Sequence, residues 1–173
     1  MNIPNILTIF RFCLVLVFVY VFYALPPGLN LIWSTVVFLS AGLTDLLDGY
    51  IARKYNLVTK WGKLMDPLAD KLMIVTVLLC LYDTGMIPLF VIVIVIVKEV
   101  LMIAGAAFLY KRRNQVVSAN YYGKTATLIF YVAIVALILG LPFAHFILFL
   151  AVLATLLALV QYAYRNMKRE KKA

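Results

Sequence analysis

The sequence predicts an all-α integral membrane protein with six transmembrane helices in one membrane domain that covers residues 1–173. Three observations support this prediction. Hydrophobic residues make up 66% of the chain and the mean hydropathy is +1.04, both higher than a water-soluble domain of this size needs. The apolar residues form six runs of about 20 residues, which is the length of one bilayer crossing. The connections between these runs alternate between turns without Lys or Arg and basic loops.

Six apolar segments follow one another along the chain. They cover residues 6–24, 30–53, 63–82, 86–110, 118–140 and 143–164. The first segment has no small-residue cleavage site, so we expect a retained helix and not a removable signal peptide. Turn-forming residues follow the first, third and fifth segments: Pro26-Pro27-Gly28, Asp83-Thr84-Gly85 and Gly140-Leu141-Pro142.

The charged residues predict how the helices are oriented in the membrane. The three turns just named contain no Lys or Arg. The other connections are basic: Arg53, Lys54, Lys60 and Lys63, then Lys111-Arg112-Arg113, then the tail 165–172. Cytoplasmic loops carry the excess of Lys and Arg, so we expect both termini and the 54–62 loop in the cytoplasm of a multi-pass cell membrane protein. This distribution indicates that the net charge of +9 interacts with a membrane surface and not with nucleic acid.

Four of the seven acidic residues lie in the stretch DLLDGYIARKYNLVTKWGKLMDPLAD, residues 45–70. Asp45 and Asp48 are three residues apart and Asp66 and Asp70 are four apart, so each pair shares one helix face. A short basic loop joins the two helices, so antiparallel packing can bring the four carboxylates together. Unpaired, they would repel one another and take up protons.

Divalent cations remove this repulsion. Oxygen-only ligands suit Mg²⁺, Mn²⁺ or Ca²⁺ and not zinc, because no Cys or His accompanies them. Two ions about 3.5–4 Å apart form a clamp for displacement at phosphorus. Gly49 and Ala52 leave room on the aspartate face for a bulky ligand, and Arg53 offers a planar fork for phosphate oxygens. The predicted chemistry is phosphoryl-group transfer at the cytoplasmic membrane boundary.

Other interpretations of the four aspartates exist. Single acidic residues near helix ends often pair with a nearby Lys or lie among lipid headgroups. An ion or proton transporter also carries buried carboxylates, but transporters more often show inverted repeats and broken helices near the midplane. A non-catalytic scaffold would be expected to lose at least one of the four.

The complete pattern resembles the signature of the CDP-alcohol phosphatidyltransferase family. It reads Asp-x-x-Asp-Gly-x-x-Ala-Arg, eight residues, then Gly-x-x-x-Asp-x-x-x-Asp, and here it comprises Asp45, Asp48, Gly49, Ala52, Arg53, Gly62, Asp66 and Asp70. The resemblance implies six membrane helices with a two-metal site on the second and third. It also implies a nucleotide-diphosphate site that is lined by Gly49, Ala52, Arg53, Thr59 and Gly62. A homodimer is expected, because family members commonly form one.

The resemblance further implies a mechanism. The four aspartates would hold two Mg²⁺ ions, with Mn²⁺ as an alternative, and Asp45 and Asp66 would be shared between the ions. Asp70 would also act as the general base on the acceptor hydroxyl, whose oxygen attacks the lipid-bearing phosphorus of a CDP-linked lipid, and CMP leaves.

The acceptor is suggested by two further stretches. The opening Met-Asn-Ile-Pro-Asn-Ile-Leu-Thr-Ile-Phe-Arg and the stretch Leu-Met-Asp-Pro-Leu-Ala-Asp-Lys-Leu-Met at 64–73 resemble bacterial phosphatidylglycerophosphate synthases. These enzymes use CDP-diacylglycerol and glycerol 3-phosphate. Asn5 and Thr8 would then face the nucleotide site, with Arg11 as a weaker candidate. The alternative for these three is helix capping and snorkelling.

A phosphorylated acceptor needs cations beside the metal site, and the candidates are Lys98, Lys124 and Arg112. We expect Lys98 not to pair with Glu99, because neighbouring helix positions point in different directions. Ala126 stands where such synthases carry a second Lys. This departure favours the alternative of a CMP-forming cardiolipin synthase, which uses phosphatidylglycerol as acceptor.

The remaining reactive residue types receive structural interpretations. Cys13 and Cys80 lie in apolar runs without metal-like spacing and are interpreted as small membrane-embedded residues. His145 lies on the side opposite the aspartates, which indicates a surface or packing role.

Overall fold

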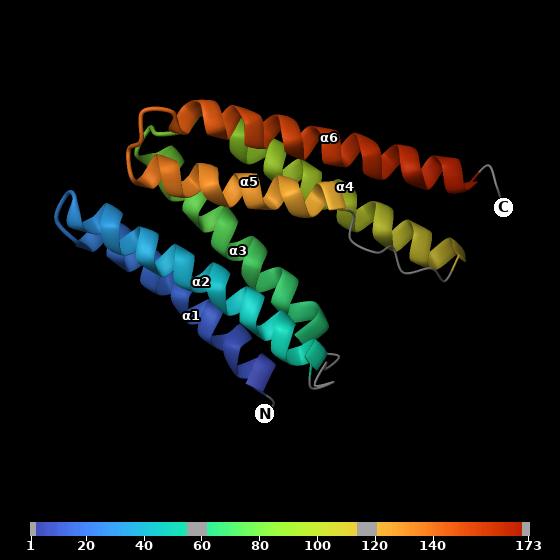
Figure 1. Cartoon of the computed structure of the whole chain (residues 1–173), viewed down its shortest axis with the longest axis horizontal. Coiled ribbons are helices and arrows are strands. Elements are labelled where there is room, and N and C mark those ends of the chain that lie inside the picture. The colour runs from blue at the N-terminus through green and yellow to red at the C-terminus, as the bar shows by residue number, and fades with distance from the viewer. Residues whose placement is uncertain (1–2, 55–61, 114–120, 171–173) are drawn as a thin grey trace. The chain divides into compact units, whose positions relative to one another are not determined.

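The computed structural model describes residues 3–54, 62–113 and 121–170, and at several helix ends beside the gaps it describes the backbone alone. All regular structure in these ranges is helical (Figure 1). The helices are α1 (Ile3–Ala24), α2 (Leu29–Lys54), α3 (Gly62–Asp83), α4 (Leu89–Arg113), α5 (Tyr121–Ile138) and α6 (Ala144–Glu170). The six predicted segments are confirmed as helices.

Two turns show why the helices end where the sequence predicts. Gly85 follows α3 with φ +72° and Gly140 follows α5 with φ +63°, a left-handed conformation that glycine adopts without a Cβ penalty. Beside them the amides of Met86 and Leu141 donate to the carbonyls of Leu81 and Ala136 at 2.8 and 2.9 Å. This six-to-one hydrogen bond is the Schellman ending of a helix.

The chain divides into two compact units, Met1–Met86 with α1 to α3 and Ile87–Ala173 with α4 to α6. In the first unit α1 packs against both α2 and α3. Its buried face recurs at helical spacing and consists of Thr8, Arg11, Leu14, Phe18 and Phe22. The facing core is made by Ser34, Phe38 and Ala41 of α2 and by Ala69, Met73, Val77 and Leu81 of α3.

Polar contacts join α1 to its neighbours near both of its ends. At its carboxyl end the hydroxyl of Tyr23 donates to a carboxylate oxygen of Asp83 at 2.9 Å and so ties α1 to the end of α3. Asn30 joins the α1–α2 turn, because its side chain donates to the Phe22 carbonyl and accepts from the Gly28 amide. The contact near the amino end belongs to the candidate site.

In the second unit α6 packs against both α4 and α5. Small residues line this core, where they let helix backbones approach closely: Ala126, Ala133, Ala136, Ala144, Ala151 and Ala158. Three helical stretches among the described residues, Ile6–Ala24, Leu29–Leu47 and Ala144–Gln161, are long and apolar enough to cross a bilayer. The chain therefore has the character of a membrane protein.

Candidate metal and phosphate site

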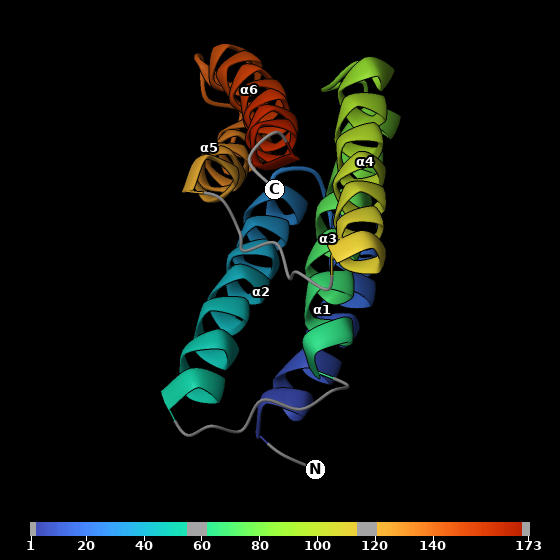
Figure 2. The same ribbon diagram turned by 90° about the vertical axis from the view of Figure 1, so that its right-hand side faces the viewer.

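The four aspartates lie on α2 and α3 of the first unit. α2 ends and α3 begins at the same end of this unit, near the start of α1 (Figure 2). Asp45 lies nine residues before the last residue of α2 and Asp70 eight residues after the first residue of α3. At 1.5 Å per residue both lie about 12–14 Å from this end, whereas Asp48 and Asp66 lie about 6–9 Å from it. The backbone thus places the four positions at two neighbouring levels.

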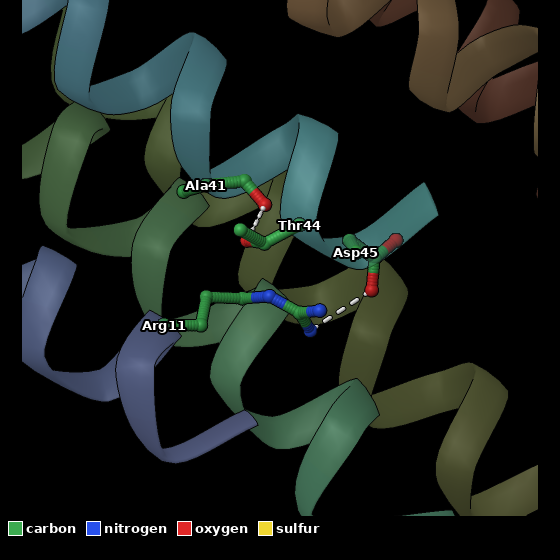
Figure 3. A network of polar contacts seen from close by, with 4 residues as sticks. All are labelled: Arg11, Ala41, Thr44 and Asp45. Atoms are coloured by element: carbon green, nitrogen blue, oxygen red, sulfur yellow. Dashed lines mark hydrogen bonds and ion pairs between the residues drawn. The ribbon is translucent and has the colours of Figure 1, made fainter. Parts of the chain in front are cut away.

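Asp45 is held by an arginine from another helix. The Nη1 atom of Arg11 on α1 lies 2.9 Å from Oδ1 of Asp45 (Figure 3). The Arg11 side chain is 1% exposed, whereas that of Asp45 is 39% exposed. Arg11 lies eight residues into α1, so it reaches the level of Asp45 and Asp70. One turn from this pair, the Thr44 hydroxyl donates to the Ala41 carbonyl at 2.7 Å.

The donor set at these positions fits hard divalent cations. Carboxylate oxygens from two adjacent helices are ligands that Mg²⁺ and Mn²⁺ accept. The Asp45 side chain keeps 39% of its surface exposed, and Asp70 is half-buried. Asp48 and Asp66 lie among the residues whose side chains are not described. Among the described side chains no three of His, Cys, Asp and Glu gather into a group, so the four-aspartate centre stays a prediction.

The predicted nucleotide-site residues fall into two groups. Thr8 is described and is 3% exposed on the buried face of α1, one turn from Arg11. The others have only a backbone position on α1, α2 or α3, or in the case of Thr59 lie outside the described residues: Asn5, Gly49, Ala52, Arg53, Gly62 and Thr59. Their contacts with a nucleotide stay predictions.

One expectation about the acceptor residues is wrong. Lys98 and Glu99 of α4 form an ion pair, with side chains 18% and 23% exposed. The long lysine stem lets Nζ reach the carboxylate of the next residue although the two Cβ atoms diverge. In an apolar helix each charge loses water, which makes pairing with any reachable opposite charge favourable. Lys124 and Arg112 have backbone positions on α5 and α4, and their roles stay predictions.

The partner of Arg11 was not predicted from the sequence. Arg11 was expected to be a weak nucleotide-site candidate, a helix-capping or a snorkelling residue, whereas the side chain is fully buried and reaches α2. A signal was present, because Arg11 is the only charged residue between positions 1 and 44. A lone charge inside an apolar segment needs a partner, and the first carboxylate after it is Asp45. Cys13 and Cys80 are free thiols, in line with their structural interpretation.

Comparison with known proteins finds a matching family model and several similar proteins. The family model for CDP-alcohol phosphatidyltransferase matches residues 1–160. A Bacillus subtilis protein named CDP-diacylglycerol–glycerol-3-phosphate 3-phosphatidyltransferase is 33% identical, over 95% of each chain. A Rickettsia bellii protein of the same name is 35% identical, over 80% of this chain and 76% of the relative. A putative cardiolipin synthase of Mycobacterium bovis is 31% identical, over 81% of this chain and 66% of the relative.

Proposed function

The chain belongs to the CDP-alcohol phosphatidyltransferase family, and from this premise we propose that it makes phosphatidylglycerophosphate. It transfers the phosphatidyl group of CDP-diacylglycerol to glycerol 3-phosphate and releases CMP. The observation that carries this proposal is the similarity to the B. subtilis protein, which extends over 95% of both chains. The protein is thus a transferase of phospholipid biosynthesis and a membrane enzyme.

The metal part of the proposal depends on the aspartates. Asp45, Asp48, Asp66 and Asp70 would hold two Mg²⁺ ions, which when bound supply positive charge to the diphosphate of the donor. Gly49, Ala52 and Gly62 leave room for the nucleotide, and Arg53 binds phosphate oxygens. What supports this is the donor chemistry and the matching depth of Asp45 and Asp70.

The reaction itself needs a base near the acceptor. Asp70 takes the proton from the acceptor hydroxyl, and the acceptor oxygen forms a bond to the phosphorus of the phosphatidyl group. The bond between this phosphorus and the CMP oxygen breaks, and CMP leaves with the electron pair. Asp70 is half-buried beside the fully buried Ala69, so its position on α3 is fixed by core packing.

The membrane arrangement is part of the proposal. All six helices cross the bilayer, and both termini and the aspartates lie on the cytoplasmic side. This orientation is supported by the basic connections and by the Lys- and Arg-free turns at Gly28, Gly85 and Gly140. The lipid part of the donor then stays in the bilayer while its nucleotide reaches water. We also propose a homodimer, as the family resemblance implies.

A cardiolipin synthase is the second candidate, with phosphatidylglycerol as the acceptor. The relative from M. bovis bears that putative name. Ala126 also supports this candidate: it is 4% exposed in the α5 core, at the position where the synthases carry a second lysine. Without a lysine at position 126, a synthase that uses glycerol 3-phosphate would have to bind it with the remaining candidates Lys98, Lys124 and Arg112. Of these, Lys98 already pairs with Glu99.

One experiment separates the two candidates. The purified protein in lipid nanodiscs is given CDP-diacylglycerol and Mg²⁺ with one acceptor at a time, and CMP release is measured. We expect release that depends on glycerol 3-phosphate and stops when EDTA is added. Release that depends only on phosphatidylglycerol assigns the cardiolipin synthase instead. Folded protein that releases no CMP with either acceptor contradicts both.

A further inference from the structure

The end of α6 carries basic residues that the proposed reaction does not use. α6 extends over Ala144–Glu170, whereas its stretch that is apolar enough to cross a bilayer ends at Gln161. At 1.5 Å per residue the remaining positions 162–170 add about 13 Å of helix, and Figure 1 shows this red end continuing past the start of α5. Five of the eight residues 165–172 are Lys or Arg and one is Glu. In a bilayer this part of α6 therefore lies at the level of the lipid headgroups and beyond.

The apolar part of α6 has an exposed face that leads to this basic end. Leu157, Val160 and Tyr164 follow one another at helical spacing and are 66%, 64% and 65% exposed. We call these three residues the exposed face of α6. The other side of the helix packs against α4 and α5 and includes the buried residues Thr155 and Ala158. In a bilayer the exposed face of α6 contacts acyl chains.

The register of the α6 backbone places one lysine on this face. Lys168 follows Tyr164 by four residues and Leu157 by eleven, which is close to three turns, so it occupies the next position of the exposed face. Asn166 follows the buried Thr155 by eleven residues and occupies the register of the buried side. A basic position thus lies directly below the column of acyl-chain contacts, where lipid phosphates lie.

Orientation in the membrane alone does not require this placement. An excess of Lys and Arg in a cytoplasmic segment sets orientation wherever around the helix the residues lie. A cluster of basic residues directly after a membrane span also attracts anionic lipids, with an affinity gain of about fivefold for each Lys or Arg near the surface. The match between the exposed face of α6 and Lys168 favours a lipid that contacts both.

We propose that the end of α6 is a lipid-binding surface in addition to the aspartate site, where Lys168 binds the phosphate of an anionic phospholipid whose acyl chains lie along the exposed face of α6. The partner is identified by its net negative headgroup and its two acyl chains. CDP-diacylglycerol has both features, so the surface also collects the donor in the leaflet, and this second part rests on the proposed function.

The first test measures which lipid lies at the end of α6. Trp33 and Trp61 are replaced by Phe, Tyr164→Trp supplies a single tryptophan, and brominated phosphatidylglycerol or brominated phosphatidylcholine quenches its fluorescence in vesicles. We expect phosphatidylglycerol to bind about fivefold more tightly at low salt and equally at about 1 M salt, which screens the charges. Equal affinities at low salt overturn the proposal. So does the absence of quenching by both lipids, which would mean that a second copy of the chain covers this face.

Two variants of Lys168 supply the matched comparison. Lys168→Gln removes the charge, and we expect the preference for phosphatidylglycerol to fall at least about threefold. Asn166→Lys combined with Lys168→Asn keeps the composition and net charge but moves the lysine to the register of the buried side, and we expect the same fall. A wild-type preference in this exchange variant means that net charge alone attracts the lipid and overturns the proposal. Lys168→Gln decides the test if the exchange variant fails to fold.

The second test asks whether the surface collects the donor. CMP release is measured in vesicles over a range of mole fractions of CDP-diacylglycerol. We expect Lys168→Gln to raise the half-saturating mole fraction about threefold and to leave the maximal rate unchanged, because the proposal gives Lys168 no part in the reaction. An unchanged half-saturating fraction or a lower maximal rate overturns the collection of the donor. The quenching test uses no turnover, so a failed acceptor assay and a failed lipid surface are distinguished.

Discussion

At the scale of the residue, two ion pairs lie inside apolar helices in the described part of the chain. Arg11 binds Asp45 between α1 and α2, and Lys98 binds its neighbour Glu99 within α4. The two pairs differ in what they fix. The first joins two helices, whereas the second lies within one helix and neutralises a half-buried charge. Only the first constrains the positions of helices.

The assignment of Asp70 as the base makes a prediction at the same scale. Asp70→Asn removes the proton acceptor and one metal ligand while it keeps the size of the side chain. We expect CMP release to fall by at least about 100-fold, because general bases contribute that much or more. The measurement is the acceptor-dependent assay, with Tm as the check that the variant is folded. Near-normal CMP release by folded Asp70→Asn protein would refute the role of base.

Sequence reasoning succeeded with residues in fixed motifs and failed with contacts between helices. The pattern around Asp45, Asp48, Asp66 and Asp70 was sufficient to place them on two successive helices, which are α2 and α3. Spacing along one helix cannot say which residue of another helix lies opposite, so the Arg11 contact was missed. Likewise the divergence of adjacent Cβ atoms did not exclude the Lys98–Glu99 pair, because lysine has four flexible methylene groups.

At the scale of the element, the helix boundaries follow the turn residues. The predicted segment 63–82 corresponds to α3 at Gly62–Asp83, and 30–53 corresponds to α2 at Leu29–Lys54. The largest difference is at the carboxyl end of α6, which continues from the predicted position 164 to Glu170. Hydropathy marks the apolar part of a helix, whereas its hydrogen bonds continue into the polar part, where lysine and arginine are also good helix formers.

The glycine turns predict opposite effects for two substitutions. Gly140→Ala places a Cβ on a residue with φ +63° and should destabilise the protein by about 1 kcal/mol, although the space around it is open. Gly123→Ala in α5 also meets open space but has helical geometry, so it should stabilise the protein by about 0.4–1 kcal/mol. Thermal unfolding in nanodiscs measures both.

The two glycine variants serve as controls for each other. Both add one methyl group, and in the described residues no atom beyond the adjoining backbone lies within 4 Å of either added Cβ. Any difference in Tm therefore reports backbone conformation and not packing. Shifts of the same sign in both variants would argue against the left-handed turn as the reason that glycine ends α5.

At the scale of the whole molecule, the distribution of charge predicts orientation. A phosphatase that is active only after export, inserted in the α3–α4 turn after Gly85, should be active in a bacterial host. The same enzyme at the carboxyl terminus, beyond the basic residues 165–172, should be inactive, because cytoplasmic segments carry the excess of Lys and Arg. A fluorescent protein that becomes fluorescent only in the cytoplasm should give the opposite result: no fluorescence after Gly85 and fluorescence at the carboxyl terminus. An active phosphatase at the carboxyl terminus would contradict the orientation and the cytoplasmic placement of the aspartates.

The sequence by itself determined the membrane class, the six helices, their turns and the family signature. These follow from local properties, namely hydropathy, spacing and the turn chemistry of glycine and proline, which a linear pattern records. The tertiary structure decided which side chains meet: Arg11 with Asp45, Tyr23 with Asp83 and the buried stripe of α1 with α2 and α3. These contacts depend on how each helix is rotated about its axis against its neighbours, and packing of whole faces sets this rotation.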